Sequence, residues 1–149
     1  MNYWLCITNE ENWNVVNEMN IWGASERGRN QLNRVEIGDI LILYLKQEKV
    51  NDEIRTSRIS GIFKVVTKPF WDDKRIFTYR FKDETFPYRV RLEPMIIPKE
   101  PIEFKPLVQS LNFITNKKKW SAFLQTAMRT IPKGDFERIR KRIEERAYS

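Results

Sequence analysis

Apolar positions in the first two thirds of the chain form continuous runs and alternating segments, and both patterns predict β-strands. The runs at residues 3–8 and 40–45 are apolar almost throughout and predict buried strands. Alternation at residues 59–66 predicts a further strand, in which Gly61 marks a bulge or a close approach of another segment. Two later alternating segments predict an antiparallel pair: Phe77, Tyr79 and Phe81 share one face, and Tyr88, Val90 and Leu92 share one face.

Helices are predicted where apolar residues recur every three or four positions. Residues 11–19 form one such segment, for which Asn9 is a candidate N-cap, and residues 28–34 form a short helical turn. Two longer helices are expected in the last third. Asn116 caps the first, with the stripe Trp120, Phe123, Leu124, Ala127, Met128 and Ile131; Gly134 and Asp135 open the second, with Phe136, Ile139 and Ile143 inward.

The elements combine into an α+β fold built around a strongly bent sheet or barrel of five or six strands, with peripheral helices. Polar residues 46–56 are expected to form a hairpin loop, and residues 68–74 an irregular loop. The chain has 149 residues and no internal repeat, low-complexity tract or glycine-serine linker. We therefore expect one domain over residues 1–149.

Composition excludes several classes of protein. The chain has no histidine, which removes Ser-His-Asp and Cys-His catalysis and nearly all catalytic zinc sites, and we expect neither cofactor nor metal. Cys6 is the single cysteine and lies in a predicted buried strand, where packing is its expected role. The longest apolar run has six residues, and no secretory signal precedes it, so the expected location is cytoplasmic and no membrane partner is expected.

The formal net charge is +7, and basic residues outnumber acidic ones most strongly in the last third. Lys117, Lys118 and Lys119 belong to this region and form either a phosphate-binding face or a solvated surface. The 5 Trp, 5 Tyr and 9 Phe residues add many rings on which bases could stack. Together these features favour a nucleic-acid partner.

Five short motifs resemble those of an EVE domain in both order and spacing. They are YWLCITN at 3–9, IWG at 21–23, GDILILY at 38–44, SGIFKV at 60–65 and the loop PFWD at 69–72. EVE domains belong to the PUA-like β-barrels and are similar to YTH domains, which read N6-methyladenine in RNA. The resemblance covers nearly the whole chain and implies a stand-alone domain with a pocket for an extruded, often modified base.

The resemblance also implies site residues. Trp22 resembles the first cage tryptophan of YTH domains, and Thr8 and Asn9 resemble the polar stretch that contacts the base edge. An aromatic residue followed by an aspartate is usual in the EVE loop, and either Phe70 or Trp71 could stack. The implied base pocket comprises Thr8, Asn9, Trp22, Gly23, Ser25, Phe70, Trp71 and Asp72.

These residue types suit base recognition. Stacking on an aromatic ring contributes about 1–3 kcal/mol per base, which can offset the cost of taking a base out of its stack. Asn9 can donate to and accept from a base edge, and an ionised Asp72 can accept from an exocyclic amine. Each residue also has a structural alternative: Trp22 as a core anchor, Asn9 as a helix cap and Asp72 as a turn residue.

Phosphate contacts are expected from Arg27 and Arg29, which closely follow Trp22, and from the three lysines at 117–119. Arg129 is a candidate counterpart of the arginine that usually ends EVE sequences. The expected function is non-catalytic binding of DNA or RNA through a flipped-out, modified or unpaired base. The sequence leaves open the base, the type of nucleic acid and the oligomeric state.

Two other classes of function remain as alternatives. Glu103, Phe104 and Lys105 follow Asp83 in the order of carboxylates and lysine found in Mg²⁺-dependent nucleases. Such triplets are frequent in a charge-rich chain. A protein-binding scaffold is the other alternative, but it would leave the aromatic loop and the basic C-terminus without a shared role.

Overall fold

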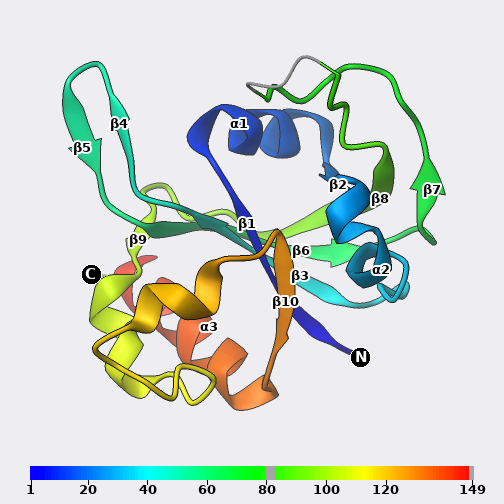
Figure 1. Cartoon of the computed structure of the whole chain (residues 1–149). Coiled ribbons are helices and arrows are strands. Elements are labelled where there is room, and N and C mark those ends of the chain that lie inside the picture. The colour runs from blue at the N-terminus through cyan, green and yellow to red at the C-terminus, as the bar shows by residue number, and fades with distance from the viewer. Residues whose placement is uncertain (80–82, 148–149) are drawn as a thin grey trace.

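The computed structural model describes residues 1–79 and 83–147 and shows a curled, mixed half-barrel sheet with helices on both faces (Figure 1). Six strands follow one another across the sheet: β10 (Met128–Ile131), β1 (Tyr3–Thr8), β3 (Ile40–Leu45), β6 (Arg58–Val65), β8 (Tyr88–Ile96) and β2 (Ile21–Ala24). β1 and β3 pair in parallel, and the other neighbouring pairs are antiparallel. The predicted α+β fold with a strongly bent sheet is confirmed.

Four short strands extend or flank this sheet. β7 (Phe70–Trp71) pairs with β8, and β9 (Ile102–Glu103) pairs with β6. β4 (Glu48–Val50) and β5 (Glu53–Arg55) form a separate hairpin, which confirms the hairpin predicted for residues 46–56. The strand β7 lies within the loop predicted for residues 68–74.

Alternating side chains place one hydrophobic core on each face of the sheet. On β1, Trp4 and Cys6 belong to the first core, whereas Leu5 belongs to the second. The first core includes Trp13 and Val16 of α1 (Glu10–Met19), and the second includes Phe136, Ile139 and Ile143 of α3 (Lys133–Ala147). The buried positions expected for Cys6 and for the last helix are therefore confirmed.

The shorter helices also follow the sequence pattern in part. η1 (Glu26–Gly28) and α2 (Arg29–Leu32) together correspond to the helical turn predicted for residues 28–34. η2 (Lys105–Ser110) and η3 (Trp120–Leu124) are 3-10 helices that pack against the second core. Within the described residues, no helix is long and apolar enough to cross a membrane.

The long helix predicted after Asn116 is wrong. Only Trp120–Leu124 is helical, and Met128–Ile131 is a strand that pairs with β1. The apolar positions that suggested one helix face serve two cores, since Met128 lies in the first core and Ile131 in the second. Pairing with the edge of β1 satisfies the backbone hydrogen bonds of β10, and this pairing outweighs the local helical pattern.

The strand predicted through Phe77 and Tyr79 is also wrong, because both residues lie in irregular chain. Phe81 lies outside the described residues. Side chains hold the described residues 72–79 in place: Asn12 binds Thr78, and Arg89 binds the carbonyl of Lys74. Gly61 fulfils both predicted roles: the pairing of β3 with β6 shifts beside it, and a Cβ there would lie 2.8 Å from the Trp13 ring.

Candidate nucleic-acid interface

Trp22 lies in β2, opposite Val90 of β8, and its side chain is part of the first core. Only 4% of the residue is exposed. Its indole Nε1 is buried and has no hydrogen-bond acceptor among the described residues. The Trp4 indole, by contrast, donates to Oδ2 of Asp39 at 3.0 Å. Trp22 therefore combines a core position with an unused polar donor.

Gly23 brings two aromatic residues close to the strand that carries Trp22. A Cβ on Gly23 would lie 2.7 Å from the carbonyl oxygen of Phe86 and 2.8 Å from Cε2 of Phe77. The Phe77 and Phe86 rings pack edge to face, with centroids 5.8 Å apart. Only glycine leaves room for this contact. Sequence reasoning missed both phenylalanines as neighbours of the site, although the aromatic spacing at 77 and 79 was visible.

Arg89 fixes the segment that carries these phenylalanines. It is 1% exposed, and its guanidinium donates to the backbone carbonyls of Lys74, Thr85 and Phe86. Burial lowers the pKa of Arg89, and the carboxylates of Asp72 and Asp73 oppose that shift. Because the three carbonyls come from both ends of the segment between β7 and β8, one side chain holds that segment together.

The three residues of the aromatic-aspartate loop, Phe70, Trp71 and Asp72, have different environments. Phe70 is half-buried beneath the Arg91 guanidinium, which lies 5.6 Å from its ring centroid, whereas Trp71 is 61% exposed. Asp72 accepts from the backbone N–H of Lys74 and lies 3.5 Å from Nη1 of Arg89. Asp72 is thus a turn residue and an ion-pair partner, and its role toward a base remains a prediction.

Asn9 caps α1, because its Oδ1 accepts from the backbone N–H of Asn12 at 2.8 Å. The cap engages Oδ1 of Asn9 and not its Nδ2. Asn12, which sequence reasoning passed over, is 6% exposed and binds the backbone N–H and carbonyl of Thr78. Thr8 is half-buried at the end of β1.

The structure connects the end of β1 to the end of β2 through a close contact. The N–H of Ile7 donates to the carbonyl of Ala127. A Cβ on Gly28 would lie 3.6 Å from the Ala127 side chain and 3.2 Å from that of Ala24. Ser25, which is half-buried, follows Ala24 and precedes Gly28 in the sequence. The end of β1 and the end of η1 therefore both lie close to Ala127.

The predicted phosphate-binding residues fall into two groups. Arg27 and Arg29 are exposed beside β2, and Arg29 pairs with Glu26 at 2.9 Å. Arg129 lies 4.6 Å from the centroid of Phe113, a residue of the second core, and burial lowers the pKa of Arg129. The structure therefore places Arg129 on the opposite face of the sheet from Trp22.

The lysines at 117–119 belong to that second group. Lys117 donates to the carbonyls of Val108 and Leu111. Its ammonium thus binds the end of η2, while Lys118 and Lys119 are exposed next to it. The structure does not bring these lysines together with Trp22, and their phosphate contacts remain predictions.

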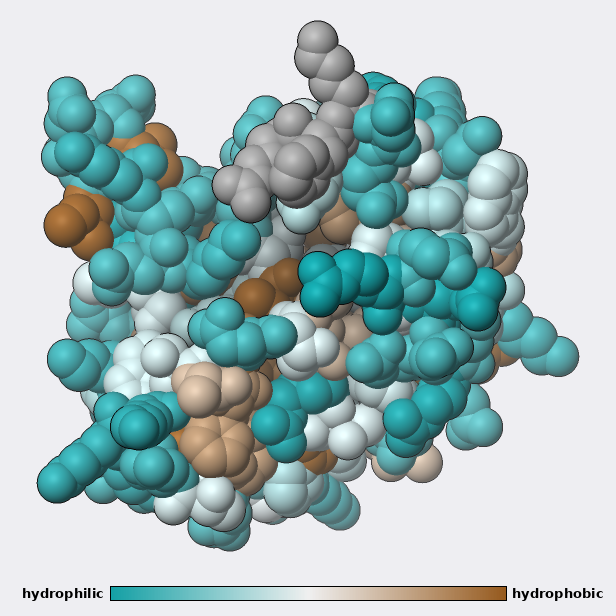
Figure 2. Space-filling model, in the orientation of Figure 1, coloured by the Kyte–Doolittle hydropathy of each residue, from teal (hydrophilic) through white to brown (hydrophobic). Residues whose placement is uncertain are grey.

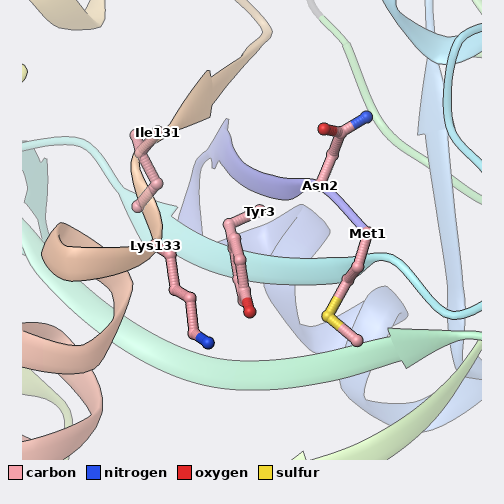
Figure 3. Close-up of a pocket in the computed structure, with 5 residues that line it drawn as sticks. All are labelled: Met1, Asn2, Tyr3, Ile131 and Lys133. Atoms are coloured by element: carbon pink, nitrogen blue, oxygen red, sulfur yellow. The ribbon is translucent and has the colours of Figure 1, made fainter.

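Two cavities lie apart from the predicted base residues. One has a volume of about 480 Å³, and Figure 3 shows its lining side chains: Met1, Asn2, Tyr3, Ile131 and Lys133. The second, of about 370 Å³, is lined by Gln47, Thr56, Ser57, Glu103, Lys105, Pro106 and Trp120. The first lies at the start of β1, the opposite end of the strand from Thr8 and Asn9.

The second cavity contains two residues of the nuclease-like triplet. Glu103 accepts a hydrogen bond from the Thr56 hydroxyl at 3.1 Å, and the intervening Phe104 is fully buried. Within residues 1–79 and 83–147, no group of three or more Cys, Asp or Glu side chains is placed to hold a metal ion. The triplet is thus divided between the core and the surface.

Hydrophilic residues dominate the face shown in Figure 2, and hydrophobic residues appear there in small, separate areas. Large exposed apolar patches are typical of protein–protein interfaces. The visible, described part of this face shows no single patch of that kind.

The chain is similar in sequence to a UPF0310 protein of Pyrococcus abyssi, with 47% identity over 140 residues, 93% of this chain and 97% of the relative. Among solved structures it is similar to the Pho92 YTH domain in complex with m6A, with a TM-score of 0.67 and 13% identity. That match covers 96% of this chain and 83% of the YTH chain.

A second similar structure is the Mmi1 YTH domain in a complex with RNA, with a TM-score of 0.64 and 9% identity over 97% of this chain and 82% of that one. At these identities the structures show a shared fold. The family model of the EVE domain matches residues 2–142. The chain therefore belongs to the EVE domain family.

Proposed function

We propose that this EVE domain binds nucleic acid without turnover and holds an unpaired, modified base at Trp22. The fold that it shares with the Pho92 and Mmi1 YTH domains supports the proposal, because those structures contain m6A and RNA respectively. The net charge of +7 suits a polyanionic partner. Trp22 lies in β2, and the strand that carries Phe70 and Trp71, β7, pairs with the same neighbouring strand, β8.

The observation that carries the proposal is the unpaired Nε1 of Trp22. A buried N–H without an acceptor costs about 1–3 kcal/mol, so the fold retains a donor that a ligand could satisfy. Base edges present ring nitrogens and carbonyl oxygens as acceptors. The N–H lies in the plane of the indole ring, so a ring that stacks on one base can donate to an acceptor of the strand beside that base, which a phenylalanine ring cannot do.

Binding at Trp22 requires the surrounding side chains to rearrange, since only 4% of this residue is exposed. Phe77 and Phe86 do not cover this ring, because they pack on Gly23, and a Cβ on Gly23 would point to the face of β2 opposite the Trp22 side chain. In the proposed bound state, these two rings would support β2 from the face away from the base.

The other proposed contacts rest on the resemblance to EVE and YTH domains and on the chemistry of each side chain. Asn9 would donate to the base edge through Nδ2, because its Oδ1 caps α1. Thr8 and Ser25 would contribute hydroxyl groups, and Asp72 would accept from an exocyclic amine. Arg27 and Arg29 would bind the phosphates that flank the base.

The test is binding to single-stranded RNA and DNA oligonucleotides that differ only in one modified base, N6-methyladenine or 5-methylcytosine. We expect one modified strand to bind more tightly than its unmodified counterpart. Trp22→Phe keeps an apolar ring but removes Nε1, and it should weaken that binding about 2- to 10-fold. Trp22→Ala should abolish the preference.

Trp13→Phe is the matched control, because Trp13 is buried in the same core. It should bind like the unaltered protein. Replacing a buried tryptophan by alanine costs about 3–5 kcal/mol, so the phenylalanine variant decides the result if the alanine variant unfolds. Equal affinity of Trp22→Phe and the unaltered protein for every oligonucleotide would disprove the Trp22 site.

A further inference from the structure

Strand pairing places an exposed aromatic residue on the same face of the sheet as Trp22. Ala24 of β2 pairs with Tyr88 of β8, and Tyr88 pairs in turn with Trp71 of β7. Directly paired residues share a face, and so do residues two apart in one strand. Trp22 therefore shares its face with Ala24, Tyr88 and Trp71.

Trp71 lies at the far end of this row, on the outermost strand beside β8 (Figure 1). It is 61% exposed, whereas the neighbouring Phe70 is half-buried on the opposite face beneath Arg91. Two interstrand spacings, together about 10 Å, separate β7 from β2. Trp71 is thus too far from Trp22 to contact the same base but close enough to contact a neighbouring nucleotide.

Tyr88, between the two strands, is fixed in place. Its hydroxyl donates to the carboxylate of Glu26, and Glu26 also pairs with Arg29. This chain of contacts connects the row to η1, which carries the exposed Arg27. Tyr88 thus contacts the element that carries Arg27, and the carboxylate of Glu26 is engaged by Tyr88 and Arg29.

We propose that Trp71, with Tyr88 beside it, stacks on a nucleotide that flanks the base held at Trp22 in a single strand. The assignment rests on the proposed function and extends it along the strand. Charge complementarity favours this ligand, because Arg27 and Arg29 lie at one end of the aromatic row and would bind the connecting phosphates. An aromatic platform accepts any base, since every base has a π-face.

The platform can be tested with oligonucleotides that carry the same central modified base and either normal or abasic flanking nucleotides. Trp71→Ala should weaken binding of the strand with normal flanks about 5- to 150-fold. It should leave the affinity for the strand with abasic flanks unchanged. Trp71→Phe should retain most of the affinity for the strand with normal flanks.

Ile54→Ala is the matched control, because Ile54 is also a large, exposed apolar residue at 67% exposure but lies on β5. It should bind both strands like the unaltered protein. The platform is disproved if Trp71→Ala binds the normally flanked strand as tightly as the unaltered protein does. An equal loss on both strands would also disprove it.

This experiment separates the platform from the Trp22 site. Trp22→Phe should weaken binding of both strands, since it acts on the central base. If Trp22→Phe binds both strands like the unaltered protein but Trp71→Ala still weakens only the strand with normal flanks, the platform stands and the Trp22 site fails.

Discussion

At the residue scale, the surroundings of each tryptophan separate residues that composition alone could not distinguish. Trp4 donates to Asp39, Trp13 packs beside Gly61, and Trp22 is buried with a free indole donor. Trp71 is exposed, and Trp120 lies 5.8 Å from Phe104, centroid to centroid. Two of them keep a feature that no contact among the described residues uses: the buried Nε1 of Trp22 and the exposed ring of Trp71.

The buried thiol of Cys6 gives a prediction at the same scale. Burial raises its pKa well above the usual value, which disfavours the reactive thiolate. In the folded protein we expect a thiol reagent such as 5,5′-dithiobis(2-nitrobenzoate) to react far more slowly than with free cysteine, and raising the pH to 9 should not remove this protection.

Absorbance at 412 nm measures the reaction, and the same protein in denaturant is the control, in which the reaction should become rapid. A folded protein whose thiol reacts as fast as free cysteine would show that Cys6 is accessible.

At the element scale, Arg89 is the side chain on which the segment between β7 and β8 depends most. It supplies donors to three carbonyls, and Asp72 lies 3.5 Å from it. Asn12 of α1 holds the same segment at Thr78. Two polar side chains, Arg89 and Asn12, thus bind the backbone of this segment at Lys74, Thr78, Thr85 and Phe86. Neither set of contacts was predictable from the local sequence pattern.

Arg89→Lys should lower the free energy of unfolding by about 2–4 kcal/mol. Lysine keeps the charge but lacks the planar fork that reaches several carbonyls, and hydrogen bonds to charged groups contribute about 1.5–3 kcal/mol each. Urea unfolding followed by circular dichroism measures the change. Arg91→Lys is the control, because Arg91 is exposed, and it should change stability by less than about 0.5 kcal/mol. Equal stability of the two variants would contradict this role of Arg89.

The two wrong elements show where sequence patterns stop being informative. Between residues 120 and 131 the apolar spacing fits a helix, yet the residues are divided between two cores that only the completed sheet defines. Strongly patterned segments such as β1, β3, β6 and α3 were predicted correctly, because each carries its own period and turn signals. In the two segments that were predicted wrongly, tertiary contacts determine the secondary structure.

At the scale of the whole molecule, the sequence was sufficient for the fold class and the family. Two of the motifs supply β2, with Trp22 and Gly23, and β7, with Phe70 and Trp71, and both strands pair with β8. The contribution of Phe77, Phe86, Arg89 and Asn12 could not be predicted, because each acts through residues distant in sequence. Arg129 and Lys117 illustrate the limit of charge counting, since both bind their own chain.

The central claim is that a base binds at Trp22, and the indole N–H resonances of the 5 tryptophans report on it directly. A ¹H–¹⁵N correlation spectrum should be recorded while the preferred modified oligonucleotide is added, with Trp22→Phe used to assign the Trp22 signal. We predict a large shift of the Trp22 indole signal as its N–H gains an acceptor, and little change for Trp4, whose N–H is already bound to Asp39. Saturable binding that leaves the Trp22 indole signal in place would contradict the claim.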